Sequence, residues 1–144
     1  MLIRKFKRGD IFTVMRLVNE IFQEDYDPQI LFGFYNEWQD GFIVAEENNE
    51  ILGLVVGSLP EPTRARILIL AVEEPYRNKG IGSQLLQVFL NECIIRGVKL
   101  VTLEVRVSNL GAIEFYKKRK FFIVQIIPHY YKDGEDGYVM QKLL

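Results

Sequence analysis

The hydrophobic residues of this 144-residue chain follow two different spacings, and the spacing changes repeatedly from one segment to the next. Alternation at every second residue, or a short unbroken apolar run, predicts strands at residues 2–6, 42–46, 51–58, 64–72, 99–107, 121–127 and 138–143. Apolar residues three and four positions apart predict helices at residues 11–22, 28–38, 81–95 and 109–118.

This order, β-αα-βββ-α-β-α-ββ, predicts an α/β fold (of the α+β kind) in which about four helices cover a mixed seven-stranded sheet. The central strand-helix-strand unit is expected to join two parallel strands by a right-handed crossover. Asp10, Asp27 and Ser108 stand where helices are predicted to begin, and each is a residue type that caps helices. Pro28 suits a first helical turn, and residues 47–50 form a polar turn of hairpin length.

Composition narrows the class of protein. With 49% hydrophobic and 26% charged residues, residues 1–144 are expected to form one globular domain with a full core. A net charge of −1 argues against a general nucleic-acid binder, which would carry a basic face. The single cysteine, Cys93, permits no intrachain disulfide or multi-cysteine metal site, and its apolar helix face predicts simple packing. No signal segment or apolar run of about 20 residues is present, so we expect a cytoplasmic protein without a membrane partner.

One junction carries the first chemical signal. Arg77-Asn78-Lys79-Gly80-Ile81-Gly82 follows an unbroken apolar strand and opens a predicted helix. Two glycines two positions apart allow a tight turn and close approach of a ligand, while the free N–H groups and positive dipole of the helix start attract phosphate. Arg77 and Lys79 add positive charge, so the junction is predicted to be an anion cradle.

Three known phosphate-binding motifs, and an ordinary strand-to-helix turn, are the alternative interpretations of this junction. A nucleoside-triphosphate loop requires Gly-Lys-Ser/Thr, whereas this chain reads Gly80-Ile81-Gly82-Ser83. A dinucleotide fingerprint requires a third glycine where Leu85 stands, and it normally follows the first strand. The remaining pattern, Arg-x-x-Gly-x-Gly, resembles the pyrophosphate-binding motif of the GCN5-related N-acetyltransferases (GNAT), and the element order resembles their fold over essentially the whole chain.

That resemblance implies acetyl-coenzyme A as cosubstrate, no metal, and acetyl transfer to an amine. It implies coenzyme contacts from the strand end, the cradle and the later helix: Leu70, Ala71, Val72, Arg77, Asn78, Lys79, Gly80, Ile81, Gly82, Ser83, Asn109 and Tyr116. It also implies a bulge near Val72 whose unpaired N–H would hold the oxyanion of the transfer.

Glu104 and Tyr116 are the candidate catalytic residues. Glu104 lies in an apolar strand on the same face as Thr102 and Arg106, so it is either a carboxylate paired with Arg106 or a general base made more basic by partial desolvation, acting directly or through water. Periodicity alone favours Tyr116 as a residue at the edge of the core. The family resemblance implies instead that it protonates the departing thiolate.

Two further segments suggest the substrate. Residues 103–109 with Ala112, Ile113 and Tyr116 resemble the RimI-type ribosomal-protein-alanine N-acetyltransferases. Residues 130–138 resemble the Tyr-Tyr-x-Asp-Gly-Glu-Asp segment of the catalytic subunit of N-terminal acetyltransferase A (NatA). Residues 24–26 resemble the Pro-Glu-Asn-Tyr loop of that subunit, with Gln23 in place of the proline. Both families acetylate protein N-termini, which implies a peptide groove formed by Glu24, Tyr26, Tyr130 and Tyr131.

Several alternatives remain open at this point. The acceptor is a protein N-terminus, with ribosomal proteins as candidate targets, or else a lysine side chain or small amine; a dormant coenzyme-binding module is the non-enzymatic rival. An auxiliary subunit is a candidate partner, and we expect a monomer or weak dimer. Residues 133–137 are either a solvated turn or substrate contacts, and residues 117–120 are a solvated helix end or a contact for the coenzyme's ribose phosphate. Lys120 replaces the glycine that is common in the family, and His129 is assigned no role.

Overall fold

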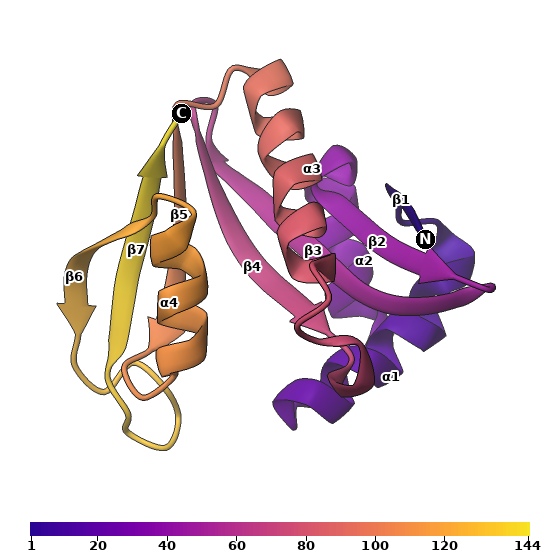
Figure 1. The fold of residues 1–144 in the computed structure, drawn as a ribbon, viewed down its shortest axis with the longest axis horizontal. Helices are drawn as coiled ribbons and strands as arrows, with labels where there is room; N and C mark the ends of the chain where they lie inside the picture. Colours follow the sequence, from indigo (N-terminus) through magenta and orange to yellow (C-terminus); the bar gives the residue numbers. More distant parts are fainter.

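The computed structural model describes all of residues 1–144, which form a seven-stranded mixed sheet in the order β1-β2-β3-β4-β5-β7-β6 (Figure 1). Neighbouring strands are antiparallel except for β4 and β5, which the helix α3 connects. This confirms the predicted element order and mixed sheet. The elements are β1 (Leu2–Lys5), α1 (Ile11–Phe22), α2 (Pro28–Glu37), β2 (Phe42–Glu47), β3 (Glu50–Glu61), β4 (Arg64–Val72), α3 (Ile81–Arg96), β5 (Leu100–Arg106), α4 (Leu110–Lys118), β6 (Phe122–Ile127) and β7 (Gly137–Leu143).

One of the three predicted helix caps is confirmed and two are wrong. Asp27 accepts a 2.9 Å hydrogen bond from the amide of Ile30 at the start of α2. At α4, Asn109 is the cap, because its side chain accepts from the Ala112 amide, while the Ser108 amide donates to Glu135. Asp10 ends a 3₁₀ turn with helical backbone angles, so its carboxylate reaches back to the Lys7 amide and Arg4 instead of capping α1.

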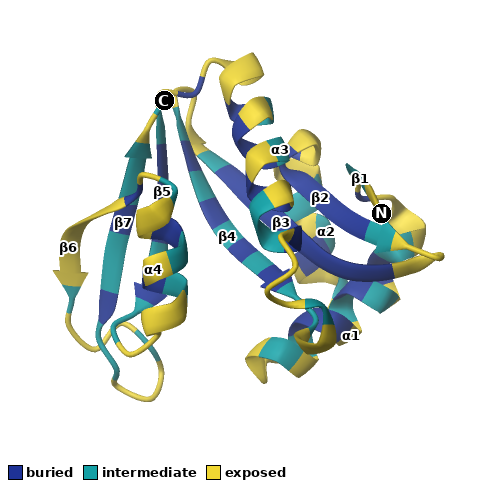
Figure 2. Ribbon diagram, in the orientation of Figure 1, coloured by how far each residue is buried: buried dark blue, intermediate teal, exposed yellow.

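Two hydrophobic cores lie on opposite faces of the sheet. α1 and α2 cover one face through Val14, Val18 and Leu31, whereas α3 and α4 cover the other (Figure 1). Cys93 is fully buried in the α3 core, and burial raises the pKa of its thiol to about 12, which confirms a packing role. Figure 2 shows the contrast between the buried strands β2 and β3 and the exposed edge strand β6. No helix combines the length and the apolar character that crossing a membrane requires.

A bulge at Leu68 reverses the faces of β4. Val56 pairs with Ile69 but Gly57 pairs with Ile67, so Leu68 is an extra residue opposite β3. Before the bulge, Ala65 and Ile67 belong to the α3 core; after it, Ile69 and Ala71 belong to the α1–α2 core. Because side chains alternate along a strand, the extra residue turns Leu70 and Val72 to the α3 face. The bulge expected near Val72 therefore lies four residues earlier.

β4 and β5 separate soon after they begin to pair. Their ladder covers only residues 64–66 and 100–102, whereas β5 pairs with β7 along its whole length. Beyond this ladder the two halves of the sheet spread apart, toward the bottom of Figure 1. The Glu73 amide donates to Leu52 across β3, so by alternation Leu70 and Val72 present their backbone N–H and C=O groups to the edge that β5 has left.

Candidate active site

A cavity of about 500 Å³ lies on the α3 face where β4 and β5 separate. The end of β4, the loop before α3, the first turn of α3 and one face of α4 form its walls. The lining residues are Leu70, Val72, Tyr76, Arg77, Asn78, Gly80, Ile81, Gly82, Ser83, Ala112, Phe115, Tyr116 and Arg119.

The floor of the cavity is the start of α3. Gly80 takes the N-cap position with a φ of 83°, a left-handed conformation that a side chain would strain. The amide of Gln84 closes the first helical bond to Gly80, while the amides of Ile81, Gly82 and Ser83 donate to no group in the protein. Three free donors therefore stand at the positive end of a 16-residue helix, which is an arrangement suited to an anion.

The charges around the cavity have the same sign. Arg77 and Arg119 are its only charged lining residues, and neither forms an ion pair with a carboxylate. Arg77 donates from Nε to the Val72 carbonyl oxygen at 2.8 Å, which ties the cradle loop to the end of β4. The free amides and the two arginines therefore form a donor set whose charge and chemistry suit the diphosphate of a coenzyme.

Three of the coenzyme contacts predicted from the sequence do not line this cavity. Ala71 faces the α1–α2 core, Asn109 uses its side chain to cap α4, and Lys79 is exposed with its ammonium 5.7 Å from the ring centre of Tyr76. Three lining residues were missed: Tyr76, Ala112 and Phe115. Arg119 also lines the cavity, and it belongs to residues 117–120, for which a coenzyme contact was one of two alternatives. Ala112, Phe115, Tyr116 and Arg119 have the spacing i, i+3, i+4, i+7, which marks a single helix face and was the available signal.

Tyr116 reaches the cavity from α4. Its residue is 8% exposed, and its ring lies edge-on to Phe115 and Phe121, with both ring centres 5.3 Å away. Its hydroxyl makes no hydrogen bond. Among side-chain polar atoms, only Trp38 Nε1 is both fully enclosed and without a hydrogen-bond partner. The Tyr116 hydroxyl also has no partner, so it is not fully enclosed and is accessible from the cavity. Burial raises the pKa of Tyr116 above its ordinary value, which keeps the phenol protonated and able to donate.

Glu104 lies on the other face of the sheet. Leu103 and Val105 point into the α3 core, so Glu104 points away from it, into a second hollow of about 320 Å³. Its carboxylate forms an ion pair with Arg66, with 3.3 Å between Nε and Oε2, and accepts a 3.0 Å hydrogen bond from the Tyr130 hydroxyl. The alternative pairing with Arg106 is wrong.

Comparison with known proteins identifies the family. The model for the acetyltransferase (GNAT) family matches residues 11–121, more than half of the chain. The chain belongs to this family. An N-alpha-acetyltransferase of Sulfurisphaera tokodaii is similar, with 33% identity over 150 residues that cover 96% of this chain and 90% of the relative.

Solved structures of acetyltransferases superpose on the chain over nearly their whole length. Ard1 from Thermoplasma volcanium has a TM-score of 0.95 at 37% identity, covering 99% of this chain and 97% of that one. Naa50 of Arabidopsis thaliana, solved in complex with the bisubstrate analogue CoA-Ac-MVNAL, has a TM-score of 0.86 at 27% identity, covering 99% and 98%.

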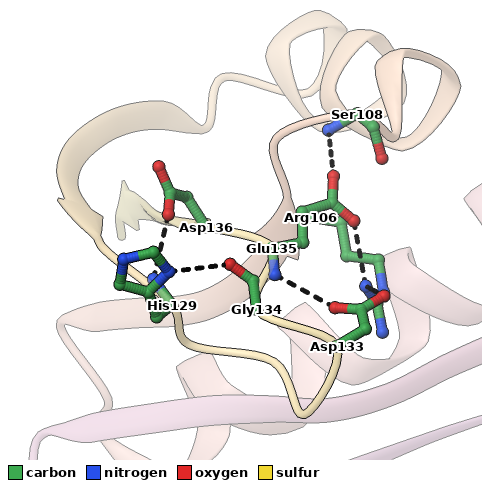
Figure 3. Close-up of polar contacts among 7 residues, drawn as sticks. All are labelled: Arg106, Ser108, His129, Asp133, Gly134, Glu135 and Asp136. Atoms are coloured by element: carbon green, nitrogen blue, oxygen red, sulfur yellow. Dashed lines mark hydrogen bonds and ion pairs between the residues drawn. The ribbon is translucent and has the colours of Figure 1, made fainter.

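The β6–β7 loop of this acetyltransferase is folded by its own acidic residues (Figure 3). Arg106 Nη1 donates to Asp133 at 2.8 Å and to Glu135 at 2.9 Å, and Glu135 also accepts from the Ser108 amide. The hydrogen bond from the Ser108 amide and the Arg106 guanidinium lower the pKa of Glu135. The acidic run is thus a solvent-facing turn that Arg106 and the Ser108 amide tie to the end of β5. His129 also has a structural role, because its amide donates to Asp136 and its Nδ1 lies 3.0 Å from the Gly134 carbonyl oxygen.

This loop presents two tyrosines beside Glu104. Tyr131 packs under the Arg106 guanidinium at 4.2 Å, and its ring is edge-on to Tyr130, with 5.0 Å between the ring centres. A Cβ at Gly137 would come within 3.1 Å of the Tyr130 ring, so glycine leaves room for the tyrosine in the position from which it reaches Glu104. The hydrogen bond therefore joins Tyr130 of the β6–β7 loop to the Glu104 carboxylate of β5.

The other predicted groove residues lie on the α1–α2 loop. The backbone N–H and C=O of Tyr26 bond to the side chain of Asn19, and its ring lies 6.5 Å from Phe34, between ring centres. Glu24 is exposed and forms no ion pair. Figure 1 places the end of α1 and the β6–β7 loop at the same end of the sheet, where β4 and β5 have spread apart.

Proposed function

We propose that this GNAT enzyme transfers the acetyl group of acetyl-coenzyme A to the α-amino group of protein N-termini. The observation that carries the proposal is the position of the two hollows on opposite faces of the sheet, at the place where β4 and β5 part. One contains the free amides of α3, and the other contains Glu104, whose carboxylate accepts the hydrogen bond from Tyr130. A coenzyme and a peptide end entering from the two faces would meet between the strands.

The residues of the first hollow suit coenzyme A. The amides of Ile81, Gly82 and Ser83, with Arg77, would hold its diphosphate, and the outward backbone groups of Leu70 and Val72 would bind the amide-bearing arm. Bound there, the coenzyme supplies an acetyl thioester with an electrophilic carbonyl carbon. The N–H groups of Leu70 and Val72 would stabilise the negative charge that develops on the acyl oxygen, because no strand partner competes for them.

Glu104 acts as the general base and Tyr116 as the general acid. Glu104 takes a proton from the incoming ammonium, directly or through one water, and Arg66 and Tyr130 hold its carboxylate in place. As the amine nitrogen bonds to the acyl carbon and the C–S bond breaks, Tyr116 donates its proton to the departing thiolate from the coenzyme side. The second proton of the nitrogen leaves to solvent, and the Tyr116 phenolate takes a proton back from solvent. Because an N-terminal amine has a pKa near 8 whereas a lysine amine is near 10.4, a chain terminus supplies the neutral nucleophile more readily.

The peptide would lie against the tyrosine-rich loop. Tyr130 and Tyr131 offer flat walls and hydroxyls to an extended backbone, while Tyr26 and Glu24 line the approach from the α1–α2 loop. We include ribosomal proteins among the proteins whose N-termini the enzyme acetylates. The chain acts as a monomer or weak dimer that can join an auxiliary subunit, and sedimentation with and without candidate partners tests that part.

Mass spectrometry of acetylated peptide pools tests the activity. Peptides with a free N-terminal Ser, Ala, Thr or Met and one internal lysine are incubated with the protein and acetyl-coenzyme A. Modification of the α-amine alone is expected. Modification of the lysine, or of peptides whose N-terminus is already blocked, would assign the enzyme to the side-chain class instead. The absence of turnover with intact coenzyme binding would favour a dormant module.

A further inference from the structure

The hollow that contains Glu104 extends along β4 and β5 as far as Arg64, the first residue of β4. Ala65 and Ile67 point into the α3 core, so by alternation Arg64 and Arg66 lie on the same face of the sheet as Glu104. These two arginines and the glutamate are the only charged residues that line the hollow, which therefore carries a net positive charge.

The two arginines of the hollow differ in their partners. The guanidinium of Arg66 forms an ion pair with Glu104. Arg64 makes only two long contacts, from Nη1 to the Thr102 hydroxyl at 3.4 Å and from Nη2 to Oε1 of Glu61 at 3.5 Å. Glu61 does not line the hollow and its side chain is 62% exposed, so this ion pair contributes little. The charge of Arg64 is therefore available to an anion that enters the hollow.

We propose that the enzyme selects protein N-termini that carry an acidic side chain at the first or second residue, and that Arg64 binds the carboxylate of that side chain. The inference rests on the proposed function, in which Glu104 receives the α-ammonium. Such a chain end has a positive and a negative group close together, and Glu104 and Arg64 present the complementary charges in one hollow. Arg64 is then a residue that determines specificity.

The spacing along the strand suits this assignment. Nη1 of Arg64 lies beside Thr102, which precedes Glu104 by two residues, or about 7 Å of strand. Consecutive Cα atoms of a peptide are about 3.8 Å apart, so an amine at Glu104 leaves the side chain of the first or second residue within reach of Arg64. Thr102 is 8% exposed, and its hydroxyl can donate a hydrogen bond to the same carboxylate.

The surroundings of the hollow also favour an acidic side chain. Ile127 and Val139 line it with apolar groups against which the methylene of an aspartate can pack. The carboxylates of Asp133 and Glu135, on the neighbouring β6–β7 loop, are paired with Arg106, which offsets their repulsion of an incoming anion. A substrate with Lys or Arg at the same position would place a further cation beside two arginines, so it should be rejected.

Paired peptides test the inference. One pair carries Asp or Asn at the first residue, and the other carries Ser at the first residue and Asp or Asn at the second. For each peptide kcat/KM is measured under saturating acetyl-coenzyme A, in the wild type and in Arg64→Gln. We expect the wild type to prefer Asp over Asn about tenfold at one of the two positions, the scale of one hydrogen bond to a charged group. That position identifies the residue that enters the hollow, and in Arg64→Gln the preference is expected to disappear.

The matched control is Arg96→Gln, which removes one positive charge from the exposed end of α3 and should keep the wild-type ratio of Asp to Asn. Arg64→Lys, which retains the charge, should keep part of the preference, and Arg64→Met repeats the test should the glutamine variant unfold. Equal kcat/KM for Asp and Asn at both positions in the wild type would overturn the inference, as would an unchanged ratio in Arg64→Gln. If the wild type binds coenzyme A but acetylates none of the peptides, the proposed function itself fails, and the inference fails with it.

Discussion

The hydroxyl of Tyr130 donates a 3.0 Å hydrogen bond to Oε1 of Glu104, although the tyrosine lies on the β6–β7 loop and the glutamate in the middle of β5. Arg66 of β4 contacts the same carboxylate. Three separate segments therefore fix the position of one candidate base. The loop that contributes the tyrosine is in turn held by Arg106, through Asp133 and Glu135.

Glu104→Gln is expected to lower kcat by about 10²–10⁴-fold, since an amide cannot accept the proton of the ammonium. Coenzyme affinity should not change, because Glu104 lies on the opposite face from the cavity. Steady-state kinetics and calorimetry measure the two quantities. Glu114→Gln, at an exposed position of α4, is the matched control and should retain full turnover. Equal loss in both variants would remove Glu104 from the mechanism.

Tyr130→Phe is expected to lower kcat/KM about tenfold, because it removes one hydrogen bond to a charged carboxylate. Tyr35→Phe serves as control, since the Tyr35 hydroxyl on α2 makes no hydrogen bond in the structure and its ring packs edge-on to Phe6, away from both hollows. Peptide titrations under saturating acetyl-coenzyme A compare the two. Identical kinetics in both variants would contradict a positioning role for Tyr130.

Tyr116→Phe is expected to lower kcat and leave coenzyme affinity unchanged. Burial raises the pKa of Tyr116 above 10, so the folded enzyme keeps the phenol neutral at pH values where an unfolded tyrosine ionises. Tyr116 therefore stays protonated between pH 7 and 9.5. We expect kcat, measured over this range, to have the same pH dependence in the wild type and in Tyr116→Phe; a decline in the wild type alone would contradict this.

The same raised pKa makes stability depend on alkaline pH. Folding keeps Tyr116 neutral, so the free energy of unfolding should fall as pH rises past the unfolded value near 10. Urea denaturation at pH 9 and pH 11 measures this fall, which should be smaller in Tyr116→Phe. A fall of the same size in both proteins would show that Tyr116 does not contribute to it.

Gly80→Ala is expected to destabilise the fold by about 1 kcal/mol, because the φ of 83° suits glycine. It should also weaken coenzyme binding, since relief of the strain would move the first amides of α3. Gly111→Ala is the matched control in α4. A Cβ there meets nothing within 4 Å, so the change is expected to stabilise the protein by about 0.5–1 kcal/mol. Thermal unfolding and calorimetry read out both effects.

Periodicity was sufficient to predict the element order, because each strand and helix keeps its own spacing over several residues. It was not sufficient to place the bulge at Leu68. Residues 67–72 are all apolar, so alternation marks no change of face within them. Helix capping was uncertain for a related reason: Ser108 and Asn109 are both capping types, and Glu135, 27 residues away, decides which of them caps α4.

The site was predicted in part by motif and in part not at all. The cradle at residues 77–83 is visible in the sequence because its spacing is local. The partners of Glu104 are not, since Arg66 and Tyr130 are 38 and 26 positions away and any cation or hydroxyl on neighbouring strands would satisfy the same pattern. Arg119 could have been assigned from the helical face that it shares with Ala112 and Tyr116.

Because β4 and β5 separate, each of the two proposed reactants has its own entrance, on opposite faces of the sheet. In the proposed mechanism the coenzyme can be exchanged on one face of the sheet while the polypeptide is still bound on the other, so the two products can leave in either order. The bulk of a protein target also stays outside, since only its first residues need to thread between the strands.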